Sequence, residues 1–253
     1  MDFDISHLLE QWDYQPGQVV VRKFKAKKKK KKIQLRVDLG MLQMNAEGRP
    51  DRKRPFGHNS LFDYYQTRLY KHVADHSGSD DGFKLRAEDC GKLQLEALQY
   101  HHRYICLLQL EDYAGVVRDA ERNLAVFHFV GKHAETEDLA WSLRQFQPQL
   151  MMILTRARAM QSLKTNDYGV AITQIEQGIE TVRTFYTDHS RAELGEQSGE
   201  LHSLENWLSE IRASRPLSAR ERLEQALSEA VQCEDYEKAA QMRDALRNLE
   251  SDK

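Results

Sequence analysis

Cysteine, proline and long apolar runs are all scarce in this chain of 253 residues. Its three cysteines, Cys90, Cys106 and Cys233, lie far apart and form no CxxC pair, which argues against a disulfide framework and against a cysteine-based zinc site. No stretch approaches the roughly eighteen uncharged apolar residues that a membrane span needs. The first residues are acidic where a signal peptide would be basic. We therefore expect a cytoplasmic protein that does not associate with membranes.

Motifs of catalytic sites are also missing. The sequence has no GxxxxGK[ST] phosphate loop, which argues against ATPase activity. His72 and His76 stand one helical turn apart, but Val73 occupies the position where the HExxH metal motif has its glutamate. The alternative interpretation is a pair of polar histidines near a helix end. We expect no enzymatic activity, no cofactor and no metal site.

Charge is distributed unevenly along the chain. Residues 1–58 contain fourteen Lys or Arg against seven Asp or Glu, whereas the remaining residues contain 23 against 32, so a basic head precedes an acidic body. Such an asymmetry is compatible with an anionic partner or with docking of one part of the protein on another.

The basic head is expected to contain a β-hairpin with a lysine-rich tip. A β-branched and aromatic run consists of Val19, Val20, Val21 and Phe24. Residues 33–39 alternate in polarity, with Leu39 on the apolar face, and this strand is expected to continue through Met41, Leu42 and Met44. The candidate polyanion-binding residues are Arg22, Lys23, Lys25, Lys27, Lys28, Lys29, Lys30, Lys31, Lys32, Arg52, Lys53 and Arg54. They would neutralise phosphates, and Phe24 and Phe56 would stack on bases. Two alternatives are a solvated loop that protects a sheet edge and a basic localisation signal.

The middle of the chain has helical periodicity and a weak internal repeat. Residues 61–74 and almost everything after residue 85 are expected to be helical. At Asp112-Tyr113 and again at Asp167-Tyr168, an amphipathic helix ends and another begins. The aspartate is expected to cap the new helix and the tyrosine to pack against the preceding one. Over residues 92–130 and 139–188 this pattern resembles tetratricopeptide-type helical hairpins, although the spacing exceeds that family's repeat.

The C-terminal segment carries the most specific pattern of the sequence. Two apolar stripes flank the turn Glu234-Asp-Tyr-Glu-Lys-Ala-Ala240, which is followed by Arg243-Asp244. This resembles the UVR motif, the helical hairpin through which the B and C subunits of the bacterial excinuclease meet. The resemblance implies docking on a partner protein or on a second copy. The expected partner-binding residues are Leu223, Leu227, Glu234, Asp235, Tyr236, Ala239, Ala240, Arg243, Asp244, Leu246 and Leu249. The alternative is a third Asp-Tyr hairpin with a purely structural role.

These patterns predict a mainly α protein with an N-terminal β-hairpin, a repeat-like helical bundle and a C-terminal UVR-like antiparallel helical hairpin. The expected segments are a basic N-terminal segment (1–60), a helical domain (61–190), a connecting helix and linker (191–219) and the hairpin (220–253). The expected function is that of a non-enzymatic adaptor that binds proteins through the hairpin and a helical groove. The alternative is a nucleic-acid-associated protein, for example in DNA repair, that uses the lysine-rich tip.

Overall fold

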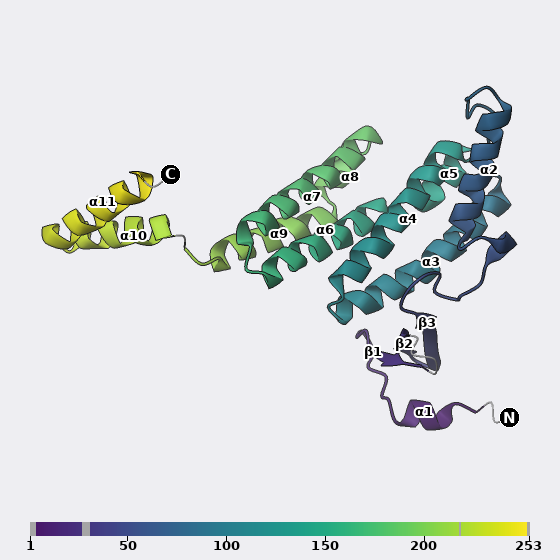
Figure 1. Ribbon diagram of the computed structural model, residues 1–253, viewed down its shortest axis with the longest axis horizontal. Coiled ribbons are helices and arrows are strands. Elements are labelled where there is room, and N and C mark those ends of the chain that lie inside the picture. Colours follow the sequence, from purple (N-terminus) through teal and green to yellow (C-terminus); the bar gives the residue numbers. More distant parts are fainter. Residues whose placement is uncertain (1–3, 27–30, 218, 252–253) are drawn as a thin grey trace. The chain divides into compact units, whose positions relative to one another are not determined.

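The computed structural model describes residues 4–26, 31–217 and 219–251. The chain forms two compact units, Met1–Leu208 and Ser209–Lys253. Both are helical, and the first also contains a small antiparallel sheet (Figure 1). The expected mainly α fold with a short β segment is therefore confirmed. The expected segments 1–60 and 61–190 lie together in the first unit, because the sheet shares its core with the helices.

The sheet has three strands rather than the two expected. Strands β1 (Val21–Lys25), β2 (Lys31–Val37) and β3 (Gly40–Asn45) form an antiparallel sheet in the order β1-β2-β3. The prediction that the second strand runs on through Met44 is wrong, because the chain reverses between Val37 and Gly40, which pair with each other. The Arg36 guanidinium holds this turn by donating hydrogen bonds to the carbonyls of Val37, Asp38 and Gly40. Leu39 lies at the turn and is 91% exposed, not on the apolar face.

Both faces of the sheet are covered. Ile33 and Met44 are buried in the core that the sheet shares with the helices. Arg36, on the opposite face, donates from Nε to the Trp12 carbonyl at 2.8 Å, and the Arg22 guanidinium lies 4.2 Å from the centre of the Trp12 ring. The N-terminal segment with helix α1 (Ser6–Glu10) therefore covers the polar face, which supplies the burial that an isolated hairpin lacks.

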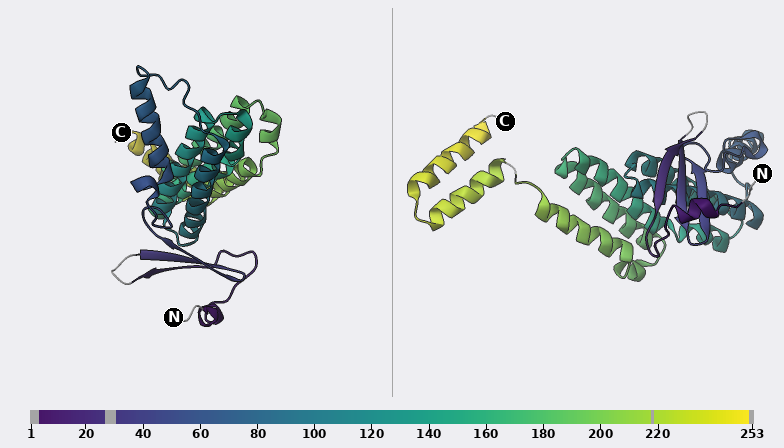
Figure 2. Two further views of the ribbon diagram at one scale, coloured as in Figure 1. Left: turned by 90° about the vertical axis from the view of Figure 1, so that its right-hand side faces the viewer. Right: turned by 90° about the horizontal axis from the view of Figure 1, so that it is seen from below.

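Helices that follow one another in the chain pack side by side in the first unit (Figures 1 and 2). Helix α3 packs against α4, α4 against α6, and α6 against α7, while α2 packs against α3 and α8 against α7. The bounds are η2 (Pro55–Gly57), α2 (Leu61–Asp75), α3 (Ala87–Gln109), α4 (Tyr113–His133), α5 (Glu137–Arg144), α6 (Gln147–Lys164), α7 (Tyr168–Asp188), α8 (Ala192–Glu196) and α9 (Gly199–Ser214). Residues 139–188, expected to form one helical hairpin, contain α5 as a separate short helix before α6.

The two Asp-Tyr turns have the same backbone geometry. Glu111 and Asn166 end their helices with φ of 53° and 58°, and each is followed by an aspartate whose N–H donates to a carbonyl five residues earlier at 2.9 Å. This is a Schellman ending. The side chains of Asp112 and Asp167 then accept hydrogen bonds from Gly115 N at 3.2 Å and Val170 N at 3.0 Å. The expected capping role of both aspartates is confirmed.

Helices α6 and α7 pack closely at Gly178. A Cβ added there would stand 2.8 Å from Thr155 Cβ and still closer to Thr155 Oγ1 and Cγ2. Gly178→Ala should therefore lower the free energy of unfolding by about 1–3 kcal/mol through overpacking, as measured by urea titration. Gly169→Ala in the same helix is the control, because its Cβ would meet nothing closer than 3.8 Å. Equal effects of the two substitutions would contradict the close packing.

Candidate functional site

The C-terminal unit contains a two-helix hairpin of α10 (Ala219–Gln232) and α11 (Tyr236–Ser251). Its turn repeats the geometry of the other two. Glu234 has φ of 57°, Asp235 N donates to the Ala230 carbonyl at 2.8 Å, and Asp235 Oδ1 accepts from Lys238 N at 3.1 Å. Small side chains let the two helices approach here, since Ala230 and Ala239 are 3% and 8% exposed.

The tyrosine after each capping aspartate has a different environment in each turn. Tyr113 is 7% exposed, and Lys164 Nζ lies 4.7 Å from the centre of its ring. Tyr168 is half-buried. Tyr236, at the same position of the C-terminal turn, is 70% exposed. The expectation that the tyrosine of the repeat-like turns packs against its own protein thus holds for Tyr113 and in part for Tyr168, whereas Tyr236, expected to bind a partner, is accessible.

The predicted partner-binding residues divide by exposure. Ala239 is buried, and Leu223, Leu227, Ala240 and Leu246 are half-buried. The exposed ones are Glu234, Asp235, Tyr236, Arg243 and Asp244. The side chain of Leu249 lies outside the described residues. Val231, expected on the apolar stripe of α10, is 52% exposed and adds to the accessible apolar surface of the hairpin. Exposed apolar and acidic groups therefore meet at the turn.

The predicted polyanion-binding residues do not form one continuous surface. Arg22 donates to Gln34 Oε1 at 2.7 Å, Lys23 pairs with Asp112 at 2.7 Å, and Lys32 donates to Asn45 Oδ1 at 2.7 Å. These three cations hold the sheet together or attach it to the helices. Lys25 is exposed. Residues 27–30, the centre of the lysine run, lie outside the described residues.

A second group of these cations does come together. Lys31, Arg52, Lys53 and Arg54 line one cleft of about 670 Å³, beside the end of β3. Of the two aromatic residues expected to stack on bases, Phe24 is half-buried, whereas Phe56 is 64% exposed and follows this cleft segment in the chain.

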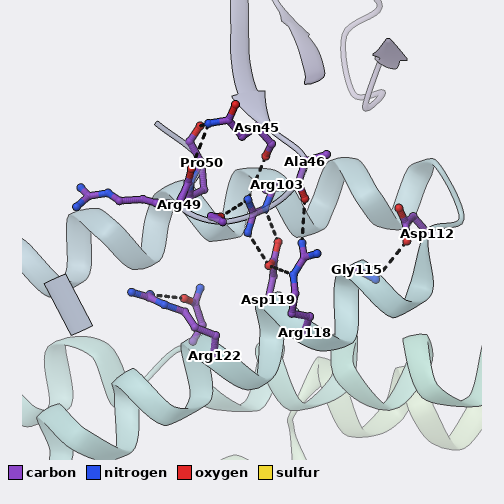
Figure 3. A network of polar contacts seen from close by, with 12 residues as sticks. Asn45, Ala46, Arg49, Pro50, Arg103, Asp112, Gly115, Arg118, Asp119 and Arg122 are labelled. Carbon is purple, nitrogen blue, oxygen red and sulfur yellow. Dashed lines mark hydrogen bonds and ion pairs between the residues drawn. The ribbon is translucent and has the colours of Figure 1, made fainter. Parts of the chain in front are cut away.

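A buried ion pair supports the segment that forms this cleft (Figure 3). Arg103 donates to Asp119 from Nε at 2.6 Å and from Nη2 at 2.7 Å, and both side chains are 1% exposed. Arg103 Nη1 donates to the carbonyls of Asn45 at 3.0 Å and Gly48 at 2.6 Å. Arg118 pairs with Asp119 at 2.9 Å. Helices α3 and α4 thereby bind the backbone that follows the sheet.

A second buried carboxylate, that of Glu96, also joins a helix to neighbouring backbone and to arginines. Glu96 in α3 is 1% exposed and accepts hydrogen bonds from the N–H groups of Leu61 at 2.8 Å and Phe62 at 3.2 Å, at the start of α2. Arg49 and Arg122 form ion pairs with it. Burial raises the pKa of the nearby Tyr100 phenol, above which the Arg122 guanidinium lies at 4.0 Å.

Sequence reasoning missed Glu96, Arg103 and Asp119. A signal was present, because Asp119 lies three residues after Val116 and four before Asn123, on the buried face of its helix. A charge on an apolar stripe needs a partner. Arg103 lies nine residues before Asp112, at the turn between α3 and α4, and Asp119 lies seven residues after it. The two antiparallel helices therefore bring these side chains face to face.

Comparisons with known proteins found no match to this chain among family models, curated proteins or solved structures. Within the described residues, no three His, Cys, Asp or Glu side chains are placed to hold a metal ion. None of the helices there is long and apolar enough to cross a membrane. His72 and His76 stack with their ring centres 3.9 Å apart, and His72 Nε2 lies 2.7 Å from the Asp81 carbonyl.

The Lys23–Asp112 pair makes the attachment of the sheet pH-dependent. The hydrogen bond from Lys23, aided by that from the Gly115 N–H, lowers the pKa of Asp112 in the folded state against the opposing effect of burial. A lowered folded-state pKa stabilises the fold above the unfolded value of about 4, and this contribution is lost as the pH falls through the folded-state pKa. Lys23→Met should therefore destabilise the protein at pH 7, and its difference from wild type should shrink on acidification to pH 2–3.

Thermal unfolding of both proteins across this pH range provides the measurement. Lys25→Met, which removes an exposed lysine of the same strand, should track the wild-type protein at every pH. A Lys23→Met difference that stays constant with pH would contradict the role of this pair.

The Arg103–Asp119 pair yields a test of how the cleft segment is held. Arg103→Met leaves Asp119 buried with only the partly exposed Arg118 as a partner and removes two bonds to loop carbonyls. We expect a loss of about 3–5 kcal/mol in the free energy of unfolding, and faster amide exchange at residues 45–50. Arg103→Met combined with Asp119→Leu should recover part of the stability but not the slow exchange. Unchanged exchange in both variants would show that other contacts hold the loop.

Proposed function

We propose that this chain is a non-enzymatic adaptor whose C-terminal hairpin docks on a partner protein. The observation that carries the proposal is the 70% exposure of Tyr236 in a turn whose counterpart buries Tyr113 to 7%. A tyrosine combines a large apolar ring with a polar end, and such residues are enriched at the centres of protein interfaces. The resemblance of this segment to the UVR motif supports the same function.

The charge around Tyr236 indicates the chemistry of the partner. Glu234, Asp235 and Glu237 surround it and are exposed. Residues 220–253 contain six cations against nine anions. A second copy of the hairpin would bring like charges together, which is unfavourable at a contact surface. The proposed partner therefore presents a basic surface with an apolar pocket for the tyrosine ring.

The helical array of the first unit offers the adaptor a second docking surface. A groove of about 610 Å³ lies among α4, α5, α6 and α7. Cations (Lys132, Arg144) and acids (Glu180, Asp188) both line it, a mixture suited to a polar peptide. The hairpin and this groove would hold two different proteins.

Tyr236→Ala tests the docking role. We expect it to weaken capture of the partner at least tenfold, since truncated interface hot spots cost 2 kcal/mol or more, and to leave the melting temperature of the first unit unchanged. The assay compares full-length tagged proteins in pull-downs quantified by mass spectrometry. Tyr70→Ala is the matched control, because Tyr70 is also 70% exposed but lies in α2.

A chain ending at Pro216 should lose the same partner as Tyr236→Ala. Raising the salt concentration should weaken capture by the wild-type protein, because exposed charges are screened. If Tyr236→Ala instead lowers the melting temperature and leaves every interaction intact, the hairpin is a structural element only. Sedimentation showing a hairpin-dependent dimer would replace the basic partner with a second copy.

A further inference from the structure

The segment that follows β3 turns its hydrogen-bond acceptors inward. Arg103 and Arg118 donate to three of its carbonyl oxygens, and the Asn45 side-chain amide donates to two more at 3.2 and 3.3 Å (Figure 3). The carbonyls engaged in this way belong to Asn45, Ala46, Gly48, Arg49 and Pro50. Because these five acceptors are used inside the protein, they are not directed at a ligand on the outer side of the segment.

The cleft on that outer side is strongly basic. Its charged lining residues are one acid, Glu47, and five cations: Lys31, Arg49, Arg52, Lys53 and Arg54. The side chains of Lys31, Arg52, Lys53 and Arg54 are exposed at the cleft. Lys31 comes from the start of β2 and the arginines from the segment after β3, so the fold collects charges from two separate parts of the chain.

Arg49 forms the inner wall of the cleft. Its side chain is 9% exposed, with Nε 2.9 Å from Asp51 and Nη1 3.1 Å from Glu96. Neither N–H is aligned for a hydrogen bond to these carboxylates. Beneath the segment, Arg103 and Arg118 pair with Asp119, and Arg122 pairs with Glu96. Together with Asp51, which pairs with Arg49, the three carboxylates behind the cleft are thus matched by arginines.

An exposed aromatic residue, Phe56, lies in the chain between two residues that line this cleft. Phe56 is 64% exposed and has φ of 51°, a left-handed conformation that is costly for a bulky residue. Its ring stacks on Tyr64 with centres 4.3 Å apart and planes at 25°. Arg54, two residues before Phe56, and Asn59, three residues after it, both line the cleft and are joined by a hydrogen bond of 3.3 Å. The fold thus keeps an aromatic ring exposed two residues from the cleft cation Arg54, with Tyr64 supporting it.

We propose that this cleft and Phe56 form a binding site for single-stranded nucleic acid. Lys31, Arg52 and Lys53 contact successive phosphates, and an unpaired base stacks on the free side of Phe56. Cationic grooves beside aromatic platforms bind single strands with little sequence preference. The exposed ring favours nucleic acid over an acidic peptide, which has no base to stack. It favours single strands over duplex, whose bases are already stacked. The site is separate from the proposed docking hairpin.

Fluorescence anisotropy with a labelled 20-nucleotide thymidine strand tests the proposal on the full-length protein. Arg52→Gln with Lys53→Gln should weaken binding and reduce the slope of log K against log salt concentration by about 0.7 for each lost phosphate contact. Phe56→Leu should weaken binding about 5- to 150-fold while leaving that slope unchanged. Phe56→Trp should bind the strand as tightly as the wild-type protein, because tryptophan keeps an aromatic face.

The control for charge is Lys71→Gln with Lys84→Gln, which removes two exposed cations outside the cleft and should leave affinity and slope unchanged. Circular dichroism melting curves should match for all variants, since every changed residue is on the surface. Several results would overturn the site: no binding by the wild-type protein at low salt, equal affinity for a duplex or for a polyglutamate peptide, or equal losses in the control variant. Loss of strand binding in the chain ending at Pro216 would also overturn it and would place binding on the hairpin.

Discussion

The attachment of the sheet to the helices depends on the buried guanidinium of Arg103. Four of its five N–H donors are used, two on Asp119 and two on the carbonyls of Asn45 and Gly48. The fork geometry of an arginine suits this role, because one side of the fork binds a carboxylate while the other binds backbone. Desolvation of such a pair is expensive, so its main effect is to select one arrangement of the segment 45–50 over others.

The Arg103–Asp119 pair also shows how the basic cleft differs from the C-terminal hairpin in the contacts that form it. The cleft is built by contacts between residues far apart in the chain, and three of the carbonyls of its segment accept hydrogen bonds from Arg103 and Arg118. The C-terminal hairpin, in contrast, is made by contacts within 33 residues. One surface depends on the tertiary fold and the other on local geometry.

The sequence predicted what is local and missed what is not. Helix α2 and the Asp-Tyr turns could be predicted because apolar periodicity and capping chemistry act over a few residues. The reversal at Asp38–Leu39 was missed because it is stabilised by Arg36, a residue that the alternating pattern assigned to a polar strand position. The division of the basic residues between structural pairs and the cleft was also missed. Lys23 meets a partner 89 residues away, and Lys31 lies with residues 47–54 only after the sheet has formed.

A left-handed residue other than glycine ends five helices of the described chain and limits how stable this protein is. Glu111 and Glu234 occupy a conformation that glycine adopts freely and that costs other residues about 1–2 kcal/mol. At Glu111 the side chain offsets part of this cost, because its carboxylate lies 3.0 Å from Lys164 Nζ at the end of α6. This ion pair joins two neighbouring turns of the array. Glycine at such a position would avoid the strain but would lose any contact that the side chain makes, so these turns hold a reserve of stability that single substitutions can reach.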